Sequence, residues 1–317
     1  MRNFAFIFPG QGSQYVGMAK DLYQSSSEVK ELYQKANQIL EFDLAGTSFE
    51  GPQEVLVQTR YTQPAIFVHS MALWQLLKKN DLKPSFVAGH SLGEYSAGVA
   101  AEVFSFEDAL LAVKNRSDLM QKACEKNKGT MAALIGLSQS QVLEICEEAS
   151  DAGIVQPANF NSGEQVAISG ELKAVEKGME LAKSRGARMA KLLPVGGAFH
   201  SELMRPAGEG MQKVLSQIKM NSASIPLVAN VTGRSVSDPQ EIQKLLTQQI
   251  TQPVLWYQSM QFIYDQGIRD FLEIGPGKVL QGLLKRSLKD VNLYGIDTLS
   301  DLENFLNFSD KPSDFAG

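Results

Sequence analysis

The stretch Ala88-Gly89-His90-Ser91-Leu92-Gly93-Glu94-Tyr95 decides how the rest of this sequence is interpreted, because it has the pattern of a buried strand followed at once by a helix. The residues that lead into it, 85–88, are short and apolar, as in a parallel strand covered on both faces. Gly89 and Gly93 flank Ser91 and complete the pattern G-x-S-x-G, in which a strained turn holds a serine hydroxyl above the sheet. A serine before a helix is often only its N-cap, so the motif alone leaves two interpretations open, a nucleophile and a cap.

Length and composition limit the class of protein. The 317 residues are 44% hydrophobic and 21% charged, so we expect one main domain with an insertion. The formal net charge of −5 argues against a general nucleic-acid binder, although it leaves room for a local basic patch. Cys124 and Cys146 lack metal-ligand spacing and are interpreted as reduced core residues. No apolar run is long enough for a signal peptide or a membrane span, so the expected location is the cytoplasm.

A glycine-rich loop follows the first predicted strand, residues 4–8. This loop, Pro9-Gly10-Gln11-Gly12-Ser13-Gln14, lacks the third glycine of a dinucleotide-binding fingerprint and the lysine of a phosphate-binding loop. We therefore interpret it as a way to bring a backbone N–H close to the end of another strand, where an oxyanion would form.

Helical spacing of apolar residues predicts several helices before and after Ser91. They lie near residues 18–23 and over 28–40, 65–79, 94–102 and 109–122, with 47–51 as a loop. Ser105 is the expected N-cap of the last of these helices. His69 is expected to be a packed or surface side chain of its helix. Arg116 lies inside the last helix, where a solvated surface arginine is the ordinary interpretation.

From residue 130 the pattern changes to an ordered series of strands and helices. The expected elements are strand 130–136, helix 138–150, strand 154–160, turn 161–163, strand 165–169, helix 171–185 and strand 188–193. The order β-α-β-β-α-β is that of a ferredoxin-like unit, a four-stranded antiparallel sheet with two helices on one face. We therefore predict a large α/β catalytic domain from residues 1–124 and 195–317, an inserted small domain over 125–194, and a binding site in the cleft between them.

The large domain is predicted to resume after the insertion. Its expected elements are a helix over 201–218, a strand over 225–230, helices near 239–249 and 254–266, and a strand over 270–274. The polar segment 309–317 is expected to fray.

The candidate nucleophile needs a base, and histidine is the usual one. Of the three histidines in the sequence, His69 lies within a predicted helix, and His90 is expected to point away from the hydroxyl of Ser91. His200 follows a double glycine at the expected hinge, so it is the candidate base, with a helix-capping or packed histidine as the alternative. No Asp or Glu between Ser91 and His200 stands at the end of a large-domain strand. This favours a dyad whose histidine is held by a neutral acceptor.

A set of motifs occurs in order along the chain. They are Phe8-Pro9-Gly10-Gln11-Gly12-Ser13-Gln14, Gln63-Pro64-Ala65, Gly89-His90-Ser91-Leu92-Gly93-Glu94, Arg116 with Leu119-Met120-Gln121, Gly197-Ala198-Phe199-His200-Ser201, Asn230-Val231-Thr232-Gly233 and Pro253-Val254-Leu255-Trp256. Together they resemble the FabD-type malonyl-CoA:acyl carrier protein transacylases of fatty acid synthesis, over nearly the whole chain. The resemblance implies an α/β-hydrolase-like core with a ferredoxin-like insertion.

The resemblance also implies the roles of the reacting residues. Ser91 would carry the malonyl ester, and His200 would act as base and then as acid. The backbone N–H groups of Gln11 and Leu92 would form the oxyanion hole, and the main-chain carbonyl of Gln249 would orient His200.

Three further residues are implied to bind substrate. Arg116 would bind the malonyl carboxylate, which replaces the interpretation of a surface arginine. Phe199 would crowd the α-carbon, and Asn161, in the hairpin between the two central strands of the small domain, would face the substrate.

The expected substrates are malonyl-CoA and the phosphopantetheine thiol of an acyl carrier protein, with no metal or redox cofactor and no nucleic-acid or membrane partner. Alternatives that stay open are a Ser/His thioesterase or hydrolase and a malonyltransferase of a polyketide pathway. A non-catalytic docking module would have no use for both Ser91 and His200. An acidic carrier would need a local basic surface, for which the candidates are Lys183, Arg185, Arg188, Lys191, Lys285, Arg286 and Lys289.

Overall fold

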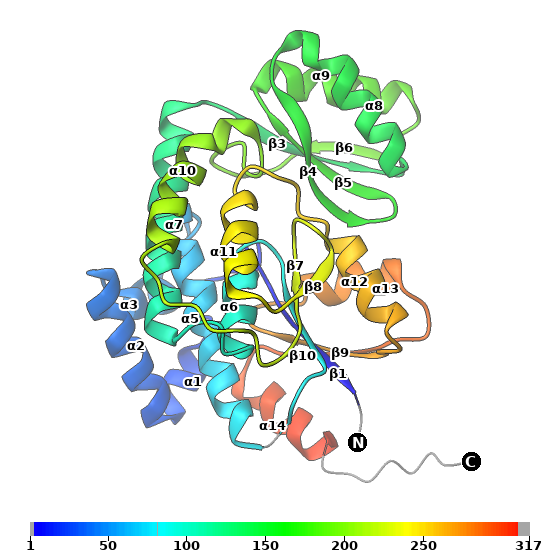
Figure 1. The fold of residues 1–317 in the computed structure, drawn as a ribbon. Coiled ribbons are helices and arrows are strands. Elements are labelled where there is room, and N and C mark those ends of the chain that lie inside the picture. The colour runs from blue at the N-terminus through cyan, green and yellow to red at the C-terminus, as the bar shows by residue number, and fades with distance from the viewer. Residues whose placement is uncertain (1–2, 81, 310–317) are drawn as a thin grey trace.

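The computed structural model describes residues 3–80 and 82–309 and has a mixed α/β fold with two separate sheets. Residues 310–317, nearly all of the segment expected to fray, lie outside the described residues. The larger sheet lies in the lower part of Figure 1 and the smaller sheet in the upper part, each with its own helices. Within the described ranges, the search for a helix with the length and apolar character of a membrane span finds none.

The larger sheet has six strands in the order β10-β9-β1-β2-β7-β8, and its neighbours are parallel except for β7 and β8. The strands are β1 (Phe4–Phe8), β2 (Phe86–Gly89), β7 (Leu227–Ala229), β8 (Arg234–Val236), β9 (Asp270–Ile274) and β10 (Asn292–Ile296). All five residues of β1 are buried, which explains its continuous apolar sequence, because a parallel strand is covered on both faces. Phe8 pairs with Gly89, so the loops that follow β1 and β2 begin side by side at one edge of the sheet.

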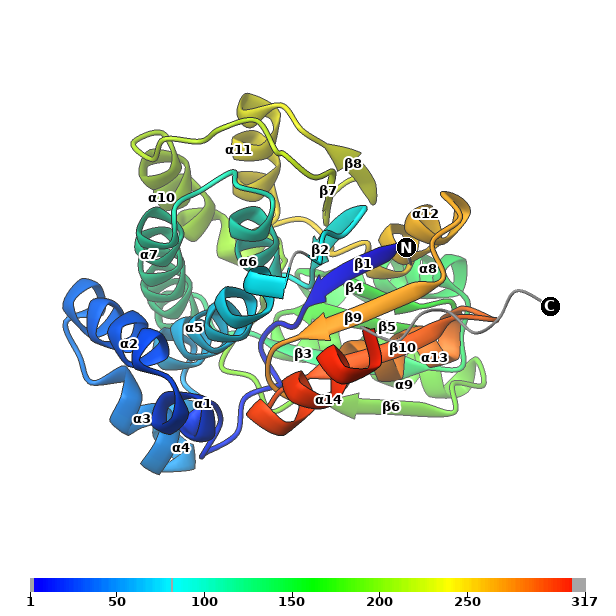
Figure 2. The same ribbon diagram turned by 90° about the horizontal axis from the view of Figure 1, so that it is seen from below.

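Helices cover both faces of this sheet. They are α1 (Lys20–Ser25), α2 (Ser27–Leu40), α3 (Leu44–Glu50), α4 (Gln53–Leu56), α5 (Thr59–Leu77), η1 (Lys78–Asn80), α6 (Gly93–Ala100), α7 (Phe106–Lys126), η3 (Glu202–Met204), α10 (Arg205–Leu215), α11 (Pro239–Gln248), α12 (Trp256–Asp265), α13 (Val279–Ser287) and α14 (Leu299–Ser309). Phe4, Phe6 and Phe8 pack into the core on one face, whereas Ala5 and Ile7 pack against α12 and α13 on the other. Successive strand residues point to opposite faces, and Figure 2 shows α5 and α6 on one side of β1 with α12 and α13 on the other.

The smaller sheet has four antiparallel strands in the order β4-β5-β3-β6. Its elements are β3 (Thr130–Ile135), α8 (Gln139–Ala149), η2 (Ser150–Ala152), β4 (Val155–Ser162), β5 (Gln165–Gly170), α9 (Leu172–Ser184) and β6 (Met189–Leu192), so the chain order is β-α-β-β-α-β. The two helices and the sheet share one hydrophobic core. The capping box of Ser138 and Gln141 fixes the start of α8.

Strand β4 is joined to the larger part of the molecule by main-chain and side-chain hydrogen bonds. Phe160 N donates to Val254 O at 2.9 Å. The side chain of Gln156 donates to the main-chain carbonyls of His200, at 3.3 Å, and Thr251, at 3.2 Å. The smaller sheet is therefore held directly above the loops that carry His200 and the end of α11.

Two details of the predicted local structure are wrong. Residues 47–50 of the loop expected over 47–51 are instead part of α3, whose start is capped by Asp43, with its side chain accepting from Gly46 N at 3.0 Å. This cap and the burial of Leu44 outweigh the weak helix propensities of the segment. Asn161 lies within β4, an edge strand, and not in a hairpin turn between two central strands.

Other elements differ in extent or are absent from the prediction. Helix α5 begins at Thr59 and contains Pro64, and the helix expected over 201–218 is a 3₁₀ turn followed by α10. Strands β8 and β10 and helices α13 and α14 are missing from the prediction, and both strands lie at edges of the larger sheet. The predicted N-cap of α7 is confirmed, since Ser105 Oγ accepts from Asp108 N at 3.0 Å.

Candidate active site

Ser91 occupies a sharp turn between β2 and α6. Its φ is 52°, in the left-handed region that residues other than glycine adopt at an energetic cost. A Cβ on Gly93 would lie 2.1 Å from Phe8 O, and a Cβ on Gly89 would lie 1.9 Å from the main chain of Gly93. Both glycines are therefore required by the close approach of α6 to the strand ends. The main chain of the turn is braced by Asn230, whose Oδ1 accepts from Ser91 N at 2.8 Å.

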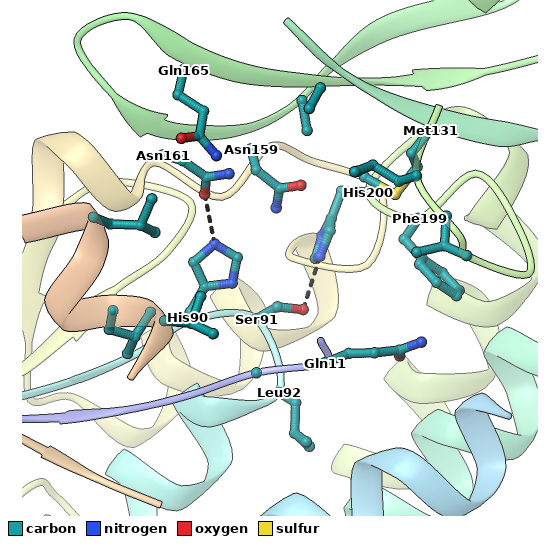
Figure 3. A pocket seen from close by; sticks show the side chains of 18 of the residues that line it. Gln11, His90, Ser91, Leu92, Met131, Asn159, Asn161, Gln165, Phe199 and His200 are labelled. Atoms are coloured by element: carbon teal, nitrogen blue, oxygen red, sulfur yellow. Dashed lines mark hydrogen bonds between the residues drawn. The ribbon is translucent and has the colours of Figure 1, made fainter. Parts of the chain in front are cut away.

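His200 lies against the hydroxyl of Ser91, as Figure 3 shows: Ser91 Oγ and His200 Nε2 are 2.8 Å apart. The other ring nitrogen, Nδ1, is 2.7 Å from the main-chain carbonyl of Gln249. Since a carbonyl only accepts, Nδ1 carries the proton and Nε2 accepts from the serine hydroxyl. Burial, followed by the positive charge of Arg116, lowers the pKa of His200 to about 3, so the ring is neutral and is a weak base in the empty site.

Arg116 is fully buried on α7 and points at the same hydroxyl. Its Nη2 donates to Ser91 Oγ at 3.0 Å and to Gln249 Oε1 at 2.9 Å, and its Nη1 donates to Gln63 Oε1 at 2.7 Å. The interpretation as a solvated surface arginine is wrong. A buried guanidinium next to the nucleophile provides a planar fork for a carboxylate.

The side chain of Gln249 links these groups to a buried carboxyl. Its Nε2 donates to Ser91 O at 2.9 Å and to Glu94 Oε2 at 2.6 Å. Burial raises the pKa of Glu94 to about 7, although hydrogen bonds from Gln249 and Asn230 N and the charge of Arg116 act in the opposite direction. Glu94 and Asn230 have no role assigned from the sequence, and the signal for both was their place in the quoted motifs.

Gln11 and Leu92 lie next to Ser91 in Figure 3, from the loop after β1 and the start of α6. Within the described residues, neither main-chain N–H has a hydrogen-bond partner. Both groups are thus free to donate to an oxygen beside Ser91. Gly10 allows the approach, because a Cβ there would lie 2.3 Å from His90 O.

These residues line a cavity of about 310 Å³ between the two sheets. The larger part contributes residues around Ser91, and β4 and β5 contribute Asn159, Asn161 and Gln165, which form a polar roof in Figure 3. Phe199 and Met131 lie on the side of His200. The residues lining the cavity are Gly10, Gln11, Gln63, His90, Ser91, Leu92, Arg116, Met120, Met131, Ala133, Asn159, Asn161, Gln165, Ala167, Leu193, Val195, Phe199, His200, Val279, Leu280, Leu283 and Arg286.

Asn161 and His90 form a separate pair on the far side of the cavity. Asn161 Oδ1 is 2.9 Å from His90 Nε2, and the His90 ring lies 5.5 Å from the ring of Trp256. His90 is therefore turned away from Ser91, as predicted. His69 lies on α5 with its side chain buried, and its Nε2 is 2.7 Å from Asp297 O.

Cys124 and Cys146 are free and buried. Among residues 3–80 and 82–309, no group of three or more His, Cys, Asp or Glu side chains is arranged to hold a metal ion.

Comparison with known proteins gives one consistent picture. A family model described as "Acyl transferase domain" matches residues 5–303. The malonyl CoA-acyl carrier protein transacylase of Staphylococcus aureus (strain MRSA252) is 42% identical over 306 residues, which are 96% of this chain and 99% of that protein.

Two solved structures have the same fold. The malonyl CoA-acyl carrier protein transacylase (fabD) of Coxiella burnetii matches with a TM-score of 0.93 and 37% identity, covering 96% of this chain and 97% of that one. A malonyl-transacylase in complex with its type II PKS acyl-carrier protein matches with a TM-score of 0.93 and 38% identity, covering 96% of this chain and 99% of that one.

Proposed function

Because this chain belongs to the acyl transferase family, and within it to the malonyl-CoA:acyl carrier protein transacylases, we propose that Ser91 and His200 move the malonyl group through a malonyl-serine intermediate. The enzyme is an acyl-carrier-protein S-malonyltransferase of the FabD type, and a role in fatty acid biosynthesis is implied by the name of these relatives. The observation that carries the proposed mechanism is the 2.8 Å contact between Ser91 Oγ and a His200 ring whose far nitrogen is held by Gln249 O.

In the first half-reaction, Ser91 Oγ attacks the thioester carbonyl carbon of malonyl-CoA while its proton moves to His200 Nε2. The main-chain N–H groups of Gln11 and Leu92 hold the oxyanion. The C–S bond then breaks, and coenzyme A leaves as a thiol after taking the proton from His200. The product is malonyl-Ser91.

The second half-reaction runs the same steps with the carrier protein. The phosphopantetheine thiol gives its proton to His200 and attacks the ester carbonyl. The bond to Ser91 Oγ breaks, and the oxygen regains a proton from His200. Each half-reaction returns the proton, so no net acid or base is consumed.

Arg116 binds the free carboxylate of the malonyl group in this scheme, with two parallel hydrogen bonds. Because Arg116 Nη2 is 3.0 Å from Ser91 Oγ, this pairing holds the acyl group next to the nucleophile.

The remaining site residues have positioning roles in the proposal. Phe199, 6% exposed, crowds the α-carbon of the acyl group and disfavours branched substrates. Asn161 faces the substrate from β4 while its side chain holds His90. The Gln249 carbonyl keeps the His200 ring in the productive orientation.

The finer fold assignment is also a proposal. We assign residues 125–194 as a ferredoxin-like domain inserted into an α/β-hydrolase-like core of residues 1–124 and 195–317. The strand order β4-β5-β3-β6 and the turn at Ser91 support this assignment. Helix α7 continues to Lys126, so it crosses the N-terminal boundary. The two free cysteines support a reducing compartment such as the cytoplasm.

Incubation with malonyl-CoA, digestion and mass spectrometry test the mechanism. One malonyl group is expected on the peptide that contains Ser91, and none in Ser91→Ala. A label elsewhere, or a label that survives the substitution, removes Ser91 as the nucleophile.

The same malonyl-enzyme separates a transferase from a hydrolase. A carrier thiol is expected to discharge the ester much faster than water does. If the malonyl ester is lost at the same rate with and without the carrier thiol, the result supports a thioesterase. Presenting both a fatty-acid and a type II polyketide carrier identifies the pathway, since one relative of this chain was solved with a polyketide carrier.

A further inference from the structure

Glu94 is a buried carboxyl group beside the active site that the reaction above does not use. It stands at the start of α6 with a relative exposure of 2%. Its Oε2 accepts from Gln249 Nε2 at 2.6 Å and from Asn230 N at 3.3 Å. Gln249 Oε1 in turn accepts from Arg116 Nη2 at 2.9 Å. One amide group therefore connects Glu94 to the guanidinium.

The charge of Glu94 fixes the orientation of that amide. An ionised carboxylate only accepts hydrogen bonds, so Gln249 must present its NH₂ group to Glu94 and its oxygen to Arg116. In this orientation the guanidinium has an acceptor and its Nη2 stays within 3.0 Å of Ser91 Oγ. Glu94 thus positions Arg116 without touching the reacting atoms.

Arg116 is the charged neighbour of Glu94 in the empty site. The other titratable groups beside Glu94 and Arg116 are Tyr95 on α6, His90 and His200. Burial raises the pKa of Tyr95 and lowers the pKa of both histidines, so all three side chains are neutral near pH 7. Above pH 7, where Glu94 is ionised, its negative charge balances the positive charge of Arg116. A malonyl carboxylate on Arg116 would bring a second anion into the same buried space, and an unbalanced buried charge is costly.

Building on the malonyl transfer proposed above, we propose that Glu94 is the counter-ion of Arg116 in the empty site and takes up one proton from solvent when a malonyl carboxylate binds Arg116. The carboxylate of Glu94 becomes a neutral carboxylic acid, and the substrate carboxylate replaces it as the counter-ion. The occupied site then has the same net charge as the empty one. The pKa of Glu94, which burial already raises to about 7 in the empty site, allows this exchange near neutral pH.

The direction of the pH effect follows from linkage. A bound carboxylate raises the pKa of Glu94 further, so the complex holds more protons than the free enzyme. Malonyl affinity should therefore fall as pH rises above about 7, by up to about tenfold per pH unit. An acetyl group has no carboxylate, so its binding should not depend on Glu94 in this way.

Isothermal titration calorimetry in two buffers of different ionisation enthalpy counts the protons taken up on binding. The titrations use Ser91→Ala, which cannot be acylated, with malonyl-CoA and acetyl-CoA at pH 8. Both ligands carry the same nucleotide and pantetheine arm, so the difference in proton uptake reports the carboxylate. Glu94→Gln in the same background keeps the size and removes the ionisation. Glu273→Gln is the matched control, since burial also raises the pKa of Glu273 to about 7 but its carboxyl caps α13.

Binding of malonyl-CoA is expected to take up more protons from solvent than binding of acetyl-CoA, and the difference should be a large fraction of one proton. The difference should survive Glu273→Gln and vanish in Glu94→Gln. Equal uptake for both ligands overturns the proposal, and so does a difference that persists in Glu94→Gln, which would assign the proton to His200 or His90.

A second measurement needs no substitution at Glu94. In the unsubstituted enzyme, kcat/KM for malonyl-CoA should decline above pH 7 relative to kcat/KM for acetyl-CoA. Parallel pH profiles for the two substrates refute the proposal even if Glu94→Gln does not fold. Failure of the malonyl-serine mechanism is distinguishable, because it shows as absence of the malonyl label on Ser91.

Discussion

Replacing Arg116 with alanine should change which acyl groups the enzyme accepts. The guanidinium donates to Gln63, Gln249 and Ser91 Oγ in the empty site, and two of its N–H groups are expected to turn to the malonyl carboxylate. Hydrogen bonds to charged groups contribute about 1.5 to 3 kcal/mol each. Loss of the pair should therefore cost about 3 to 6 kcal/mol of transition-state stabilisation for malonyl-CoA, or about 10² to 10⁴-fold in kcat/KM.

The same substitution should spare neutral acyl groups. The positive charge of Arg116 contributes to the lowered pKa of His200, so its removal makes His200 a stronger base for every substrate. Acetyl-CoA has no carboxylate to lose, and it no longer has to approach a buried guanidinium that it cannot pair. Its kcat/KM should stay constant or rise.

The assay compares kcat/KM for malonyl-, methylmalonyl- and acetyl-CoA in the unsubstituted enzyme, Arg116→Ala and Arg116→Lys. Lysine keeps the charge without the planar fork, so its effect on malonyl-CoA should be intermediate. Thermal unfolding of each variant checks the fold. If all three substrates lose the same factor, Arg116 supports the structure and the carboxylate binds elsewhere.

Three further predictions concern the base, the carrier protein and stability. His200→Ala should slow both half-reactions by about 10² to 10⁴-fold while the circular dichroism spectrum is retained; near-normal transfer would exclude His200 as the base. Reversing the charges of Lys285 and Arg286 on α13 should weaken use of the carrier protein more than use of malonyl-CoA, with the difference reduced by salt. The same change at Arg188 should have a smaller effect, because Glu164 already pairs with Arg188; equal losses for both substrates at both places contradict electrostatic docking. Folding raises the pKa of Glu273 from 4.5 to about 7, so between these values the folded state binds a proton that the unfolded state does not. The free energy of unfolding should therefore fall as pH rises from about 5 to 8. Urea unfolding should show a smaller fall in Glu273→Gln, and an unchanged fall would remove Glu273 as its cause.

The turn at Ser91 is predictable because the residues it requires stand close together in the sequence, although Gly93 is required by the distant main chain of Phe8. Gly89 and Gly93 have no room for a side chain, so the glycines on both sides of the serine are visible in the sequence as a short motif. The base was found by elimination among three histidines. Such features depend on residues near one another in the chain or on a rare residue type.

The supporting network was not predictable in the same way. Ser91 N is bonded to Asn230, 139 positions away, and Gln249 reaches both Glu94 and Arg116 from the end of α11. Nothing in the local sequence of any of these residues indicates the others. Glu94 and Asn230 lie in motifs that carry the family resemblance without a role of their own, and the resemblance gives Gln249 a role only for its main-chain carbonyl.

The position of Asn161 shows a different limit. The pairing of β4 with β5 is irregular between Phe160 and Ser162, so the extra residue changes the register at that point. Alternation along the strand does not reveal such an irregularity. Edge strands β8 and β10 were missed because their residues are largely exposed or half-buried and lack the apolar run of a central strand.

The hydrogen bonds between β4 and the loops beneath it have a consequence for how substrates reach Ser91. Lifting the roof of the cavity would break the main-chain bond from Phe160 to Val254 and pull on His200 through Gln156. The roof and the catalytic base are therefore connected by hydrogen bonds, so a shift of the small sheet would also shift the main chain of His200. The proposed transfer through one serine needs only one thioester arm beside Ser91 at a time, because coenzyme A leaves before the carrier thiol attacks.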